Sequence, residues 1–122
     1  MGYRSNIRFL VKLSDYEKLK SDCIEKYGEY SYFNYLDKEE VRKSEDGKEY
    51  MYFGWNEIKW YTNINENDYR ELDDIEETVY EFDEYQKVRI GEDYEDIEED
   101  FNLGESSVDY IRIIRKFDGE DK

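Results

Sequence analysis

The sequence predicts an α+β domain with a ferredoxin-like β-α-β-β-α-β order, in which two helices cover one face of an antiparallel sheet. Three observations predict this class. Short runs of β-branched and aromatic residues alternate with two segments whose apolar residues recur every three or four positions. The 122 residues fit one domain. The 22 aromatic residues supply apolar surface for a core, although 43% of the chain is charged. A different connectivity of the same elements stays open.

The first strand and the first helix follow each other directly. Residues 7–13 form a short β-rich run, and Ser14 with Glu17 has the spacing of a capping box that opens a helix. Gly28 is placed to end this helix. The apolar stripe of the helix consists of Tyr16, Leu19, Cys23 and Tyr27, with Ile24 beside them. Because Cys23 lies on that stripe, we expect a small buried hydrophobe rather than a nucleophile.

The middle of the chain predicts a hairpin, although the sequence does not fix the strand order and register of residues 30–62. Residues 30–36 are densely aromatic, and either a strand or a packed loop is open. Residues 41–44 and 48–55 flank a short connection in which Gly47 suits a left-handed turn position. Both faces of the longer arm are apolar, which indicates a central strand, or an edge strand that keeps one face for a partner.

Two further helices and two further strands complete the prediction. The stripe of a helix over residues 68–84 consists of Tyr69, Leu72, Ile75, Val79 and Phe82. Residues 87–90 read as a short strand, and a shorter helix between Gly91 and Gly104 has the stripe Tyr94, Ile97 and Phe101. A C-terminal strand over residues 108–117 follows. We therefore expect a single domain over 1–117 and a polar, frayed tail over 118–122.

Composition excludes much familiar chemistry. The chain has no histidine and one cysteine, so it cannot build a Ser-His-Asp or Cys-His arrangement or an internal disulfide. There is no catalytic or cofactor motif, and we expect a protein that is not an enzyme and that binds no cofactor. Without a long apolar run or an apolar N-terminal leader, we expect a cytoplasmic location in a bacterial host cell.

The acidity is concentrated in one block. Between residues 66 and 100 there are 17 acidic residues and three basic ones, a net −14 of the total −16. Projection onto helices places these acids on two outward ridges, neither of which has a lysine at i+4 to relieve repulsion. The candidate partner-binding residues are Asp73, Asp74, Glu77, Tyr80, Glu81 and Glu84 on the first ridge, and Glu92, Glu95, Asp96 and Glu99 on the second.

Two interpretations of the ridges stay open. They are either solvated helix faces or a surface that fits a basic groove by imitating a phosphate backbone. Carboxylates four residues apart on a helix rise about 6 Å per charge, whereas a DNA strand carries one phosphate per roughly 3.4 Å. Mimicry therefore requires the two helices to lie side by side.

Other uses of these residues are weaker. Asn63, Asn65, Asn67 and Asp74 fall loosely on the spacing of a calcium loop, but Asp68 stands where that loop needs glycine, so no metal site is predicted. A carboxylate pair for glycosidase-type catalysis has no specificity in so acidic a chain. Trp55 and Trp60 could stack on nucleic-acid bases, but proteins that bind nucleic acid carry a basic patch and this chain is acidic. We therefore expect both tryptophans to lie in the core.

Two short segments, Met1–Ser5 and Val88–Asp93, resemble parts of uncharacterised small acidic proteins from phages and prophages. The resemblance covers about a tenth of the chain and implies no activity and no site residues. It implies a setting in which small acidic proteins inhibit host nucleic-acid-binding enzymes, and anti-CRISPR proteins that mimic DNA are the analogy.

The sequence thus favours a non-catalytic acidic binding protein, a phage-encoded inhibitor whose partner is the basic groove of a host nucleic-acid-binding or defence protein. We expect no direct binding to nucleic acid or membrane. A small ligand-binding or carboxylate-based enzymatic domain is the alternative, and a structural component is the third. A pocket where acids and aromatics converge would favour the second class. The oligomeric state is open, with a homodimer among the choices.

Overall fold

The computed structural model describes residues 4–60, 70–92 and 96–102. Its elements in chain order are β1 (Ser5–Lys12), α1 (Leu13–Tyr27), two 3-10 turns η1 (Gly28–Tyr30) and η2 (Tyr32–Tyr35), β2 (Lys38–Lys43), β3 (Glu49–Ile58), α2 (Arg70–Tyr80), β4 (Tyr85–Ile90) and β5 (Ile97–Asn102). The predicted strand over 108–117, the tail over 118–122 and the loose calcium-loop residues 63, 65 and 67 lie outside the described residues.

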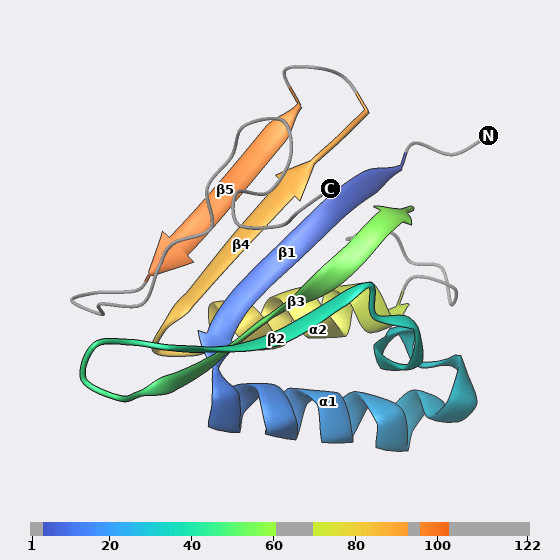
Figure 1. Ribbon diagram of the computed structural model, residues 1–122. Helices are drawn as coiled ribbons and strands as arrows, with labels where there is room; N and C mark the ends of the chain where they lie inside the picture. The colour runs from blue at the N-terminus through green and yellow to red at the C-terminus, as the bar shows by residue number, and fades with distance from the viewer. Residues whose placement is uncertain (1–3, 61–69, 93–95, 103–122) are drawn as a thin grey trace.

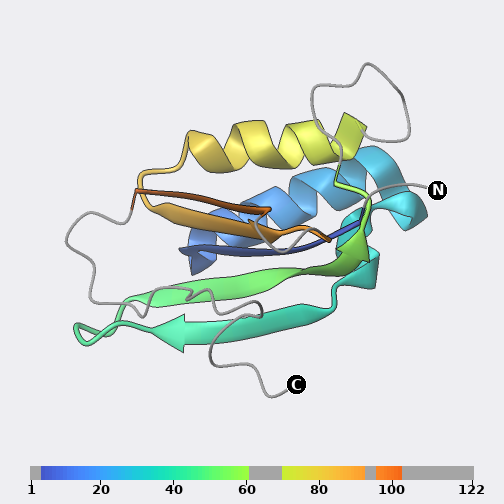
Figure 2. The same ribbon diagram turned by 90° about the horizontal axis from the view of Figure 1, so that it is seen from above.

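The strands form one antiparallel sheet in the order β2-β3-β1-β4-β5. Both helices lie on the same face of this sheet, α1 beside α2 (Figures 1 and 2). The predicted α+β class, with an antiparallel sheet and two helices on one face, is confirmed. No helix within the described ranges is both long and apolar enough to cross a membrane.

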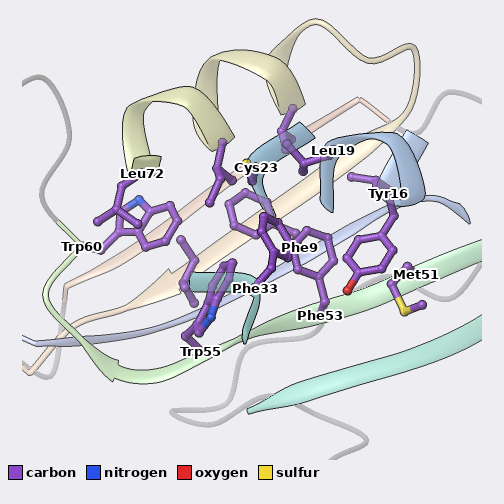
Figure 3. Close-up of a cluster of buried hydrophobic side chains, with 14 residues drawn as sticks. Phe9, Tyr16, Leu19, Cys23, Phe33, Met51, Phe53, Trp55, Trp60 and Leu72 are labelled. Atoms are coloured by element: carbon purple, nitrogen blue, oxygen red, sulfur yellow. The ribbon is translucent and has the colours of Figure 1, made fainter. Parts of the chain in front are cut away.

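The main core lies between the sheet and the helices. Alternation along β1 sends Ile7, Phe9 and Val11 to this side, where Phe9 stacks on Phe53 with 5.3 Å between ring centroids. Figure 3 shows aromatic side chains from β1, β3 and η2 meeting the apolar residues of both helices. Trp55 and Trp60 are 2% and 8% exposed, so the interpretation of both as core is confirmed.

β3 is a central strand, which explains its two apolar faces. It pairs with β2 on one side and with β1 on the other. A second buried cluster occupies the opposite face of the sheet and consists of Leu10, Tyr50, Tyr52, Val88 and Ile90. Gly54 is required in this strand, because a Cβ atom there would stand 1.9 Å from the Ile7 carbonyl oxygen.

The connections settle two open points. The aromatic stretch over residues 30–36 forms the turns η1 and η2, and Phe33 is buried in the core. The β2–β3 hairpin closes with a hydrogen bond from the Ser44 N–H to the Lys48 carbonyl at 2.9 Å, and Gly47 has φ 87°. The left-handed turn residue is therefore confirmed.

The capping box of α1 is a wrong prediction. α1 begins at Leu13, and the N-cap is Lys12, which makes no side-chain cap hydrogen bond. Pairing of β1 continues to Lys12, opposite Tyr50, so the chain is extended up to the first helical residue. Ser14 then lies inside the first turn, where its side chain is not in the cap position. The remainder of this helix is as predicted, with Cys23 buried and Gly28 at the C-cap.

The shorter helix after Gly91 is also wrong, because residues 97–102 form strand β5. β5 pairs with β4 over six residues, and the connection closes with a hydrogen bond from the Gly91 N–H to the Asp96 carbonyl at 2.7 Å. Ile97 and Phe101 are four positions apart, a spacing that places them on one face of a strand as well as of a helix. The long helix is shorter than predicted: α2 ends at Tyr80, and residues 81–84 form a turn.

Candidate acidic interface

α2 presents acids on an arc that faces away from the core. Its buried side consists of Leu72, Ile75, Val79 and the carboxylate residue Glu71. A turn of about 100° per residue places Glu77 opposite that side, with Asp74 and Tyr80 at the two margins of the outward arc. Glu77 is exposed, and Asp73 is partly exposed. The outward direction predicted for Glu77 is therefore confirmed.

At one margin, Asp74 is used to join the two helices. Its carboxylate accepts hydrogen bonds from Lys26 Nζ at 2.8 Å and from the Tyr27 hydroxyl at 2.5 Å, both on α1. Burial opposes ionisation of this group, but the hydrogen bonds from Lys26 and Tyr27 outweigh it and lower the pKa of the Asp74 carboxyl. The Asp74 carboxylate is thus paired with α1 inside the protein.

At the other margin, a buried cation joins α2 to the edge of the sheet. Lys87 on β4 is 4% exposed, and its ammonium lies 2.7 Å from Glu76 and 3.6 Å from Glu98. Burial opposes its charge, but the hydrogen bond to Glu76 keeps the pKa of Lys87 above its ordinary value. The Tyr80 hydroxyl donates to Asp100 on β5 at 3.0 Å. The outward arc of α2 therefore adjoins β5.

β5 carries the second group of acids. Arg89 on β4 pairs with Asp96 at 2.8 Å and with Glu98 at 3.1 Å. Burial opposes the charge of Arg89, but these two carboxylates raise the pKa of its guanidinium. Glu99 points to the other face of the strand and accepts a hydrogen bond from the neutral Gln86 amide at 2.8 Å. The cations of β4 thus neutralise Asp96 and Glu98, but not Glu99.

The remaining predicted residues lie apart from one another. Glu84 accepts a hydrogen bond at 2.5 Å from the Tyr50 hydroxyl, which comes from the sheet face opposite the helices. Glu92 accepts from the Arg4 N–H at 2.6 Å, at the far end of β4. Glu95 lies outside the described residues. Glu81 follows the end of α2 and is exposed.

Four exposed acids remain, which we call the acidic surface: Glu77, Glu81 and Asp100 on the helix side of the sheet, and Glu99 on the opposite face of β5. Within the described part of the chain, none of the four has a cationic partner. Sequence reasoning missed Asp100, because it placed this segment on a helix. The signal that could have found it is the alternation of Lys87 and Arg89 on β4, which matches Asp100 and Glu98 across a hairpin.

The described site is therefore an acidic helix beside an acidic edge strand, and not the expected pair of helices. Comparison with protein-family models, with curated proteins and with solved structures finds no match to this chain.

Proposed function

We propose that the chain is a non-catalytic acidic binding protein that occupies a positively charged groove of a nucleic-acid-handling or defence protein, as a phage-encoded inhibitor would. The observation that carries this proposal is the acidic surface. Its four carboxylates stay exposed on adjoining elements after the cations nearby have been used within the fold. A surface that served solubility alone would gain by interleaving lysines.

Charges from both elements are needed for mimicry. On the outward arc of α2 the charges stand about 6 Å apart. Side chains on one face of a β-strand are two residues, or about 6.8 Å, apart, so Glu98 and Asp100 on one face of β5 are no denser, and Glu99 lies on the other face. A DNA strand carries one phosphate per roughly 3.4 Å, so neither element alone reaches that density.

Exposed apolar groups next to these acids supply the other part of an interface. Phe101 and Ile97 on β5 are 58% and 37% exposed. Acidic groups accelerate the encounter with a basic partner, whereas apolar contacts that lose water slow its dissociation. In this proposal the acidic surface raises the rate of association with the partner, and these two side chains lower the rate of dissociation.

We also infer that the frame is ferredoxin-like. The first four strands stand in the order β2-β3-β1-β4, with α1 between β1 and β2 and α2 between β3 and β4. β5 extends this frame at the β4 edge.

The test uses displacement of DNA from a defined basic protein. A labelled duplex bound to a lysine-rich, non-sequence-specific DNA-binding protein is titrated with the chain, and duplex release is followed by fluorescence anisotropy. We expect release by the natural chain. A triple variant, Glu77→Lys, Glu81→Lys and Glu99→Lys, should be at least roughly tenfold weaker, because like charges then face the groove.

A matched control separates the site from net charge. The variant Glu17→Lys, Glu25→Lys and Glu29→Lys changes the charge by the same amount on exposed positions of α1 and η1. The control should displace DNA nearly as well as the natural chain. Equal losses in the two variants, or no release by the natural chain, would show that the acids of α2 and β5 are solvated faces.

A further inference from the structure

A cavity of about 430 Å³ opens at the end of the sheet where β1 begins and β3 ends. Figure 1 shows that the turns after α1 reach the same end of the sheet. Small-molecule sites have volumes of about 300–1,000 Å³. It lies apart from the acidic surface and involves none of its residues.

One wall of the cavity is an irregular, strained part of β3. Ser5 pairs with Ile58 while Ile7 pairs with Trp55, so β3 carries one extra residue here, a β-bulge. Glu57 in this bulge has φ 51°, a conformation that costs a side-chain-bearing residue about 1–2 kcal/mol. Bulges and strained residues are frequent beside functional sites.

Neighbouring side chains hold the bulge in place. The Glu57 N–H donates to Asn6 Oδ1 at 2.8 Å, and its carbonyl accepts from the Arg4 guanidinium at 3.2 Å. On the facing wall, Asp37 Oδ2 accepts from the Asn56 N–H at 2.8 Å. The Trp55 indole N–H donates to the Tyr32 carbonyl at 2.9 Å. Both walls are therefore fixed to each other before any ligand arrives.

The cavity brings both signs of charge to an aromatic surface. Asp37 and Glu57 supply two carboxylates, and Arg4 and Lys59 supply two cations. Within the described residues, the Lys59 ammonium makes no hydrogen bond or ion pair. Tyr32 and Tyr35 add ring faces, and Tyr35 is 63% exposed. A ligand of one sign would meet like charges here, whereas a zwitterion satisfies both.

We infer that this cavity binds a free amino acid with an aromatic or large apolar side chain. Its ammonium faces the carboxylates of Asp37 and Glu57, its carboxylate faces the ammonium of Lys59, and its side chain lies against the tyrosine rings. Such a ligand carries the two charges that the rim of the cavity offers and an apolar group for its aromatic residues. The inference stands apart from the proposed inhibitor role, because the two sites share no residue.

The experiment is a titration of the full chain with L-phenylalanine, followed by calorimetry and by tryptophan fluorescence, since Trp55 lines the cavity. Two analogues test the charges: phenethylamine lacks the carboxylate and 3-phenylpropionate lacks the ammonium. We expect saturable binding of phenylalanine and at least roughly tenfold weaker binding of each analogue, because each leaves a charged group of the rim without its partner.

Variants locate the site. Lys59→Gln and Asp37→Asn should each weaken binding about tenfold, and Asp37→Asn retains the oxygen that accepts from Asn56. Lys43→Gln, on the exposed strand β2, is the matched control and should bind as the natural chain does. The inference is overturned if neither phenylalanine, tyrosine, tryptophan nor leucine binds at millimolar concentration, if an analogue binds equally well, or if both rim variants keep full affinity.

Discussion

Glu71 is the buried carboxylate that fixes α2 to the turn η2, and its replacement tests how the core holds this turn. The side chain of Glu71 is inward on α2, and the residue is 3% exposed. Its two oxygens accept hydrogen bonds from the Ser31 hydroxyl at 2.6 Å and from the Tyr32 N–H at 2.9 Å. Ser31 itself is fully buried.

The change Glu71→Ala removes both acceptors and leaves the buried Ser31 hydroxyl and the half-buried Tyr32 N–H without this partner. Each unsatisfied buried group costs about 1–3 kcal/mol, so for two groups we expect a loss of about 2–6 kcal/mol in the free energy of unfolding. Glu71→Gln keeps the oxygen that faces Tyr32, and its amide donates to Ser31, whose hydroxyl is also an acceptor. We expect Glu71→Gln to stay within about 1 kcal/mol of the natural chain.

The pH dependence gives a second reading of the same site. Burial raises the pKa of the Glu71 carboxyl above its ordinary value of 4.5, although Ser31 and Tyr32 partly oppose this shift. The folded state therefore binds more protons than the unfolded state between the two pKa values, and this group's contribution to stability falls as the pH rises through that window. Relative to the natural chain, Glu71→Gln should become more stable as the pH rises from acid to neutral.

The assay is urea unfolding followed by tryptophan fluorescence, at mildly acidic and at neutral pH. Trp55 and Trp60 are both in the core, so they report its loss. Equal losses for Glu71→Ala and Glu71→Gln would refute the hydrogen-bond argument. A difference between Glu71→Gln and the natural chain that does not change with pH would refute the burial of a carboxylate at this position.

Three further changes probe other parts of the fold. Lys87→Met leaves Glu76 without its cation, and we expect a loss of about 3–5 kcal/mol in urea unfolding; a loss below about 1 kcal/mol would contradict the buried pair. Gly54→Ala drives a Cβ atom into the Ile7 carbonyl, and we expect a loss of stability at or above the roughly 1–3 kcal/mol typical of overpacking. A thermal unfolding midpoint equal to that of the natural chain would contradict this close approach of β1 and β3. Gly47→Ala, at φ 87°, should lower stability by about 1–2 kcal/mol, and calorimetry that shows no shift would contradict the turn.

Helical spacing of apolar residues predicted α2 correctly and the segment after Gly91 wrongly. The stripe Leu72, Ile75 and Val79 has spacings of three and four, and α2 is found with these residues buried. The stripe Tyr94, Ile97 and Phe101 has the same spacings of three and four and predicted a helix, yet Ile97 and Phe101 lie on strand β5. The ladder to β4 favours the strand, because it supplies hydrogen bonds for six residue pairs.

The candidate site was predictable in the sign of its charge and in the outward direction of Glu77, but not in its second element or its internal pairing. Asp74 is 48 residues from Lys26, and Lys87 is 11 residues from Glu76. Such contacts depend on how α1, α2 and β4 pack against one another, and the order of charges along the sequence does not reveal this packing. The same packing removes Asp74, Asp96 and Glu98 from the free acids and adds Asp100 to the acidic surface.

The dependence of the association rate on salt tests the central claim most directly. The rate constant for binding of the chain to the lysine-rich DNA-binding protein is measured as ionic strength rises from about 0.05 to 0.5 M. Over this range the Debye length falls about threefold. The natural chain and the α1 control variant should associate at least tenfold more slowly at the upper end. The variant with Glu77, Glu81 and Glu99 changed to lysine should lose that dependence. Equal salt dependence in all three proteins would contradict a partner surface on α2 and β5.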